Sequence, residues 1–170
     1  MRLKTLGEAP VCARCSARGP TCCEPEEGVA LAPLTPGDRR RISHATGLAP
    51  TDFTTARRLD DEERAALASE DPVLRDLVGD DGVLVSLAKK GRACTFHVSG
   101  RGCSLAYDVR PLLCRRFPVV RDRGRLTVRP GGDCLALEEA VDMPSLLVAL
   151  GLTTEELARI DRRLREDLRG

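Results

Sequence analysis

Residues 12–23 read CARCSARGPTCC and hold four of the eight cysteines of the chain. The segment begins with a C-x2-C pair and ends with two adjacent cysteines. A glycine and a proline lie between the two pairs, and both residue types favour turns, since glycine tolerates positive φ and proline fixes its own φ. We therefore expect residues 12–28 to form a loop that directs several sulfur atoms toward one point.

The other four cysteines lie far downstream, most of them shortly after a glycine or a proline. The N-terminal residues lack the apolar run of a signal peptide, and no stretch approaches the roughly 18–20 apolar residues that cross a membrane. We therefore expect a cytoplasmic protein with no membrane partner. Because thiols stay reduced in that compartment, clustered cysteines there indicate metal ligands or redox groups before they indicate disulfides.

We predict a metal site, because thiolates bind zinc and also hold iron–sulfur clusters. The favoured ligands are Cys12, Cys15, Cys22 and Cys114, with Cys23, Cys94, Cys103 and Cys134 completing or supporting the site. The spacing fits neither a zinc ribbon nor a bacterial ferredoxin, so zinc and iron, mononuclear or in a cluster, both stay open. Eight thiols exceed the four that one centre needs, which leaves two centres or some unligated cysteines. Small buried thiols and disulfides are the competing interpretations.

Length and composition indicate one α+β domain. A chain of 170 residues that is 42% hydrophobic and 31% charged is of ordinary globular composition, but it has one Tyr, three Phe and no Trp. The core must therefore rest on aliphatic side chains. We expect a small, helix-rich, irregular domain with one or two short β-hairpins organised around a cysteine metal site. The predicted divisions are an arm at 1–11, a cysteine-cluster domain at 12–140 and a C-terminal helical segment packed on it at 141–170.

Local signals predict the main elements. Apolar periodicity and helix-start residues indicate helices at 39–45, 61–67, 72–78 and 153–168. The first of these starts from Thr35 as N-cap, and the last from a capping box of Thr153 and Glu156. Alternation and turn residues predict a short strand or extended segment at 29–31, a strand at 83–88 paired with 93–97, a loop delivering Cys103, a hairpin at 119–128 and a turn at 130–133.

A basic stretch surrounds one of the downstream cysteines. Arg110, Arg115 and Arg116 are expected to neutralise thiolate charge, whereas the alternative is a nucleic-acid patch continued by Arg121, Arg123, Arg125 and Arg129. The net charge of +1 and the scarcity of aromatic residues argue against nucleic acid.

Two further groups of side chains are interpreted as ordinary surface or satisfied residues. We expect the arginines of the last helix, Arg159, Arg162, Arg163 and Arg165, to be solvated. His44 and His97 are expected to be satisfied or exposed rather than metal ligands.

Taken together, these motifs resemble the YkgJ-type cysteine-cluster proteins, also described as the CxxCxxCC zinc- or iron-chelating domain. The matching segments cover about residues 12–134 and are the early cysteine pairs, Leu34-Thr35-Pro36-Gly37-Asp38 with Arg41-Ile42, Cys94-Thr95-Phe96, Cys103-Ser104-Leu105 and Arg110-Pro111-Leu112-Leu113-Cys114-Arg115-Arg116-Phe117-Pro118. Six residues rather than two separate Cys15 from Cys22. The resemblance implies a metal-binding cysteine cluster, and a larger relative, the flagellin lysine methylase, contains a similar one.

The leading functional hypothesis is therefore a cytosolic zinc- or iron-binding protein, with no reaction assigned. One alternative is an iron–sulfur enzyme or electron carrier, which the methylase relative connects with methyl transfer. Another is a thiol redox sensor that uses Cys22 and Cys23. The sequence contains no catalytic triad, phosphate loop or paired carboxylates placed for acid–base chemistry, and it does not indicate which protein partner, if any, the chain binds.

Overall fold

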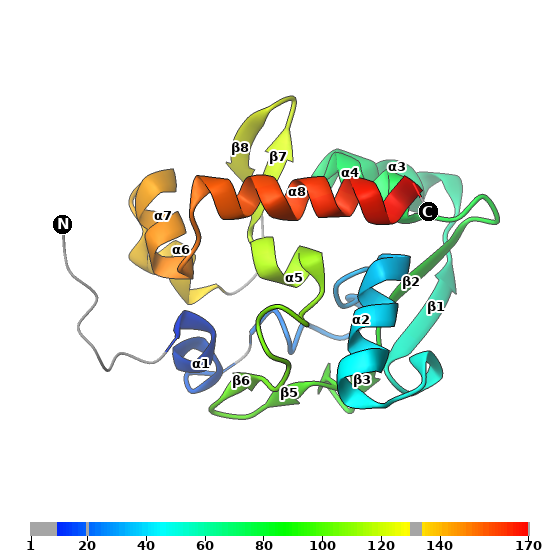
Figure 1. Ribbon diagram of the computed structural model, residues 1–170, viewed down its shortest axis with the longest axis horizontal. Coiled ribbons are helices and arrows are strands. Elements are labelled where there is room, and N and C mark those ends of the chain that lie inside the picture. Colours follow the sequence, from blue (N-terminus) through cyan, green and yellow to red (C-terminus); the bar gives the residue numbers. More distant parts are fainter. Residues whose placement is uncertain (1–9, 20, 130–133, 170) are drawn as a thin grey trace.

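Short helices alternate with small antiparallel sheets in the computed structural model, which describes residues 10–19, 21–129 and 134–169 (Figure 1). The helices are α1 (Val11–Ser16), α2 (Pro36–Thr46), α3 (Asp61–Glu70), α4 (Pro72–Leu77), α5 (Leu112–Arg116), α6 (Leu135–Glu139), α7 (Met143–Leu150) and α8 (Thr154–Arg169), with one 3-10 turn, η1 (Pro50–Asp52). The strands are β1 (Thr54–Arg58), β2 (Val83–Leu87), β3 (Lys89–Lys90), β4 (Ala93–Cys94), β5 (His97–Val98), β6 (Gly102–Cys103), β7 (Val119–Asp122) and β8 (Arg125–Val128).

The longest helix, α8, lies across one side of the molecule and packs on α5 (Figure 1). Its apolar residues recur every three or four positions, and Leu157, Ile160 and Leu164 are each 1% exposed. This periodicity places them on one face of the helix, where burial contributes roughly 1.5–3 kcal/mol per large aliphatic side chain. The predicted helix and its start are confirmed, since the Glu156 amide donates to the Thr153 hydroxyl at 3.1 Å.

Two apolar clusters make up the core. The first gathers α8, α5, α6 and α7 with residues of α1 and α4. The second contains Phe53 and Phe96, whose ring centroids are 5.7 Å apart, together with Ile42 from α2. Cysteines pack against both clusters, so the fold places thiols in apolar surroundings.

Helix α2 begins as its sequence predicts. Thr35 and Asp38 form a reciprocal cap in which each backbone amide donates to the other side chain at 2.9 Å. Gly47 ends the helix with φ of 73°, a left-handed conformation that glycine adopts without steric cost. The predicted single apolar anchor, Ile42, is fully buried.

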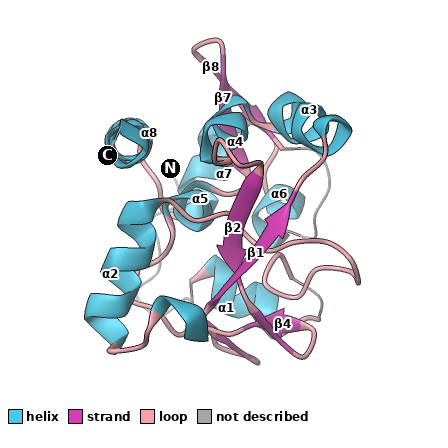
Figure 2. Ribbon diagram, turned by 90° about the vertical axis from the view of Figure 1, so that its right-hand side faces the viewer, coloured by secondary structure: helices cyan, strands magenta, loops and turns pink. Residues whose placement is uncertain are grey.

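The strand at 83–88 does not pair with 93–97 as predicted. Instead β2 pairs with β1, with Ala56 opposite Val85, across an insertion that contains α3 and α4 (Figure 2). On its other side β2 bonds the 32–34 segment, where the Leu34 amide donates to the Val85 carbonyl. Both faces of β2 are partly covered, which is why its sequence is apolar almost throughout.

Four two-stranded sheets occur in the described chain, more than the one or two expected. The hairpin at 119–128 is confirmed as β7 and β8, whereas the predicted strand at 93–97 is divided between β4 and β5. The 29–31 segment is not a strand, and Val29 is 50% exposed. The predicted turn at 130–133 and most of the predicted arm lie outside the described residues. The fold is thus a small α+β single domain, with eight helices and short antiparallel hairpins in the residues that the structure describes. None of the described helices combines the length and apolarity needed to cross a membrane.

A buried polar contact joins the start of α2 to the end of α8. The Asp167 carboxylate accepts from the Thr35 hydroxyl at 2.7 Å and from Arg41 at 3.2 Å. Gly37 lies against this carboxylate, and a Cβ atom at position 37 would overlap it. The contact therefore requires glycine at position 37.

We expect Gly37→Ala to lower the free energy of unfolding by about 1–3 kcal/mol, because the added methyl group must displace Asp167 from its partners. Urea unfolding measures the change. In an Asp167→Ala background the same substitution should cost little, since the overlapping group is gone. Equal costs in both backgrounds would show that the overlap is not the cause.

Candidate metal centre

The first C-x2-C pair lies on a helix and not on the expected loop. Cys12 and Cys15 belong to α1, where residues three apart share a face. Helix α1 packs on β6, and Gly102 of that strand lies against the backbone of Cys12. A Cβ atom at position 102 would be 3.2 Å from the Cys12 carbonyl oxygen, and φ there is +82°. Glycine thus permits the close approach that places Cys103 beside the first pair.

The second pair is fixed by backbone contacts to a downstream cysteine. The Cys94 amide donates to the Cys23 carbonyl at 2.7 Å, which joins the early cysteine segment to β4. Cys94 itself is buried, whereas Cys22 is exposed. Residues more than seventy positions apart therefore meet here, as the metal hypothesis requires.

Cys103 and Cys114 reach the same region from two further elements. Cys103 is not on a loop but in β6, opposite His97 of β5. Cys114 lies in α5 and packs with Cys23 and Cys103 against the cluster of Phe53 and Phe96. Four separate segments therefore supply thiols to one side of the molecule.

The charge of Cys23 acts on most of the other thiols in this region. A negative charge on Cys23 raises the pKa of five other thiols, which are those of Cys12, Cys22, Cys94, Cys103 and Cys114. Such coupling requires short separations, because charge interactions decay with distance and are screened by solvent. Together with the packing of Cys23, Cys94, Cys103 and Cys114 in one apolar cluster, this places early and late cysteines in one region of the fold.

Burial dominates the pKa values of most of these thiols. It raises the pKa of Cys114 well above its usual range, that of Cys94 to about 12, and those of Cys12 and Cys103 less strongly. Buried thiols resist ionisation unless a positive charge compensates them. A bound cation supplies that compensation at a metal site.

Cys23 is the exception among the shifted thiols of the described chain. A hydrogen bond from the Cys22 thiol lowers the pKa of Cys23, and the Arg110 guanidinium lowers it further. The same hydrogen bond raises the pKa of Cys22 well above its usual range. The adjacent cysteines therefore have different roles, one as hydrogen-bond donor and the other as acceptor.

A second, smaller group forms on the other side of α1. Burial raises the pKa of Cys134, and a charge on Cys15 adds to the shift. Both residues pack against the cluster that contains α8, and charges on both act on Cys12. Cys12 is thus shared between the two groups.

None of the eight cysteines, all of which lie in the described residues, forms a disulfide, so the disulfide interpretation has no support in this structure. In the described parts of the chain, no group of three or more His, Cys, Asp or Glu side chains is arranged so that it could hold a metal ion. The donor chemistry nevertheless suits zinc or iron, since soft thiolates are the ligands that both prefer in sulfur-rich sites.

Of the three arginines expected to neutralise thiolates, one lies among them. Arg110 lowers the pKa values of Cys12, Cys23 and Cys103, and its Nε donates to the Leu105 carbonyl at 3.0 Å. The prediction is wrong for Arg115, which binds Glu156 at 2.6 Å and stacks over a tyrosine ring. It is also wrong for Arg116, which is buried between two aspartates. The turn of α5 directs Cys114 to one cluster and these two arginines to the opposite side.

The two histidines have the ordinary surroundings that were expected. His44 is exposed. The side chain of His97 is 4% exposed, and its Nε2 lies 2.8 Å from the Ser16 hydroxyl. Ser16 also accepts from the Gly100 amide, so the pair fastens α1 to the β5–β6 hairpin.

Asp38 was not identified as part of this region. Its role as the third residue of a cap is visible in the sequence, but its carboxylate also accepts from the Leu112 amide at 3.0 Å at the start of α5. A charge on Asp38 contributes to the raised pKa of Cys114. Burial in turn raises the pKa of Asp38. The only sequence signal for this contact would be that the Thr35–Asp38 cap and the segment that begins α5 occur together in related chains.

No protein-family model, curated protein or solved structure matches this chain. The resemblance to the YkgJ-type cysteine-cluster proteins therefore stays a prediction that rests on the motifs quoted above.

Proposed function

We propose that this protein binds zinc or iron through its cysteines, as a mononuclear site or an iron–sulfur cluster. The observation that carries the proposal is that Cys23, Cys94, Cys103 and Cys114, from four segments of the chain, pack in one apolar cluster, with the Cys94 amide bonded to the Cys23 carbonyl at 2.7 Å. A cytosolic location and membership of the YkgJ-type family belong to the same proposal.

The arrangement of free thiols supports a metal in preference to simple core packing. Cysteines that serve only as small hydrophobes need not gather, whereas these lie together with Arg110 among them. The principal ligands in this proposal are Cys23, Cys94, Cys103 and Cys114, with Cys22 beside them. Cys12, Cys15 and Cys134 would complete that centre or hold a second one.

A bound metal would supply structural crosslinking, and an iron–sulfur cluster would also supply one-electron transfer. The chain's own residues hold the ligand segments in place. The Cys94 amide fixes the Cys23 backbone, and Arg110 supplies positive charge among three of the thiols.

Elemental analysis of protein purified without oxygen tests the proposal directly. We expect zinc or iron at one or more equivalents per chain, and acid-labile sulfide in similar amount to iron if a cluster is present. Zinc without sulfide identifies a mononuclear site. Protein that binds neither metal after reconstitution under reducing conditions would disprove the proposal.

Two serine variants locate the ligands. Cys23→Ser should lose most of the bound metal, because it removes the thiol shared by the larger group. Cys134→Ser is the matched control for that group, since charge interactions of Cys134 are with Cys12 and Cys15. Full metal content in Cys134→Ser indicates one centre, and partial loss indicates two.

A further inference from the structure

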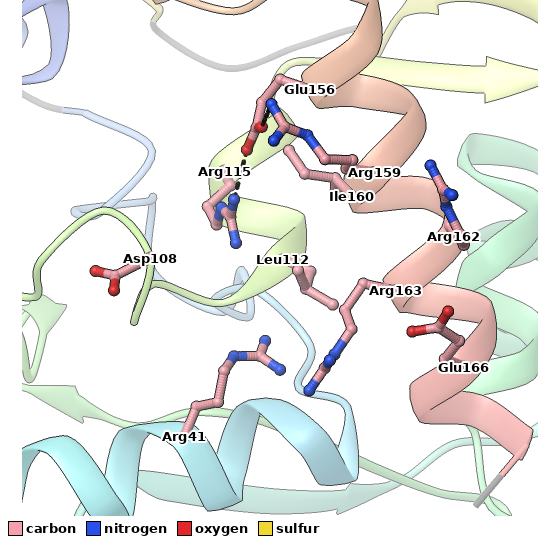
Figure 3. Close-up of a pocket in the computed structure, with 10 residues that line it drawn as sticks. All are labelled: Arg41, Asp108, Leu112, Arg115, Glu156, Arg159, Ile160, Arg162, Arg163 and Glu166. Carbon is pink, nitrogen blue, oxygen red and sulfur yellow. Dashed lines mark hydrogen bonds and ion pairs between the residues drawn. The ribbon is translucent and has the colours of Figure 1, made fainter.

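A groove at the junction of α2, α5 and α8 is lined mainly by charged side chains (Figure 3). Its volume is about 460 Å³, within the range of roughly 300–1,000 Å³ that is usual for small-molecule sites. The charged groups that line it are Arg41, Arg115, Arg159, Arg162, Arg163, Asp108, Glu156 and Glu166. The lining residues alone carry an excess of two positive charges, which Asp38 and Asp167 balance by pairing with Arg41 and Arg163. Leu112 and Ile160 also line the groove, but each is only 1% exposed.

The arginines of this groove come from three different elements and face one another. The Arg41 guanidinium from α2 and the Arg163 guanidinium from α8 point toward each other across the space beside Leu112 (Figure 3). Arg115 approaches from α5. Asp38 and Asp167 compensate the charges of Arg41 and Arg163, so an anion would bind to the N–H groups that these carboxylates leave free.

Neighbouring carboxylates orient these arginines without using all their donors. Asp167 accepts from Nη1 of Arg41 and from Nε of Arg163, each at 3.2 Å. Glu156 accepts from Nη2 of Arg115 at 2.6 Å and from Arg159 at 2.7 Å. Among the described residues, the two Nη groups of Arg163 and Nη1 of Arg115 have no protein acceptor. Arg163 is held through Nε and so presents both Nη groups in the fork geometry that binds phosphate, whereas Arg115 is held through Nη2 and presents Nη1.

We propose that this groove binds a small phosphorylated molecule, with Arg163 and Arg115 as its phosphate ligands. The inference is independent of the proposed metal site. The four α8 arginines that were expected to be solvated are exposed, and the proposal adds a ligand for one of them, Arg163. A nucleic-acid strand is disfavoured, because carboxylates interrupt the basic surface and Tyr107 is the one aromatic side chain stacked on a lining arginine in the described chain.

Calorimetric titration of the full chain with inorganic pyrophosphate tests the proposal. We expect binding to a single site, with Kd raised about tenfold or more by Arg163→Gln, since a charge-assisted hydrogen bond contributes enough for that change. Arg165→Gln is the matched control. It makes the same charge change on the same helix, and Arg165 is exposed and does not line the groove. Kd for this control should change less than about twofold, as expected for an exposed charge outside the site.

Competition experiments distinguish a built site from general ionic attraction. Sodium sulfate at equal ionic strength should displace pyrophosphate poorly. Equal weakening by Arg163→Gln and Arg165→Gln would overturn the proposal, as would binding of a single-stranded oligonucleotide in preference to pyrophosphate. Circular dichroism confirms that both variants keep the fold, and an Arg115→Gln variant repeats the test from another element.

Discussion

Removing the metal with a chelator under reducing conditions is expected to lower the melting temperature by roughly 8–16 °C. The expectation follows from linkage, because a ligand that binds only the folded state at about 1,000 times its Kd adds about 4 kcal/mol of stability. For a chain of this size each kcal/mol corresponds to roughly 2–4 °C in Tm. The ligand segments are far apart in sequence, so the unfolded chain should bind the metal weakly.

Scanning calorimetry before and after chelation measures this change. The Cys23→Ser variant is the control, because it should melt at the same temperature with and without chelator. Returning the metal identified by elemental analysis should restore the original Tm of the unaltered protein. An unaltered protein that melts alike in both conditions would show that metal binding and folding are not coupled.

Local chemistry in the sequence accounts for the elements that were predicted correctly. Thr35 and Asp38 cap α2, and the apolar repeat of α8 places Leu157 and Ile160 in the core, because both signals act over a few residues. The pairing of β2 was predicted wrongly because it joins segments that are far apart in the sequence. Its partner β1 lies 25 or more residues earlier, beyond α3 and α4, and its own sequence is short and polar. Pairing at that separation depends on tertiary packing that periodicity does not encode.

The candidate site, too, could be predicted only in part from the sequence. Cysteine content and spacing are sufficient to predict that early and late thiols meet, and the contact between Cys23 and Cys94 agrees with that. The sequence did not indicate that Cys23 rather than Cys22 bonds Cys94 and packs in its cluster, since adjacent cysteines look equivalent until their backbone is placed. The roles of Arg115 and Arg116 were missed because their partners, Glu156, Asp71 and Asp161, are 40 or more residues away.

Replacing Arg116 by methionine is expected to lower the free energy of unfolding by about 3–5 kcal/mol. The Arg116 side chain is 4% exposed and lies between Asp71 and Asp161, whose side chains are 6% and 9% exposed. Methionine has similar length but no charge, so the substitution leaves two buried carboxylates without their shared partner. Arg121, which binds Asp161 at 2.6 Å, can compensate one of them only in part.

Urea unfolding of three variants separates lost charge from lost shape. Arg116→Lys keeps the charge but cannot bind two carboxylates through a planar fork, so its cost should lie between zero and that of Arg116→Met. Arg125→Met makes the same change at an exposed position of β8 and should cost less than about 0.5 kcal/mol. Because Asp71 also caps α4 and Asp161 lies on α8, loss of Arg116 should loosen the contact between these helices and the core. If Arg116→Met and Arg125→Met unfold at the same urea concentration, the buried ion pairs do not hold the fold together.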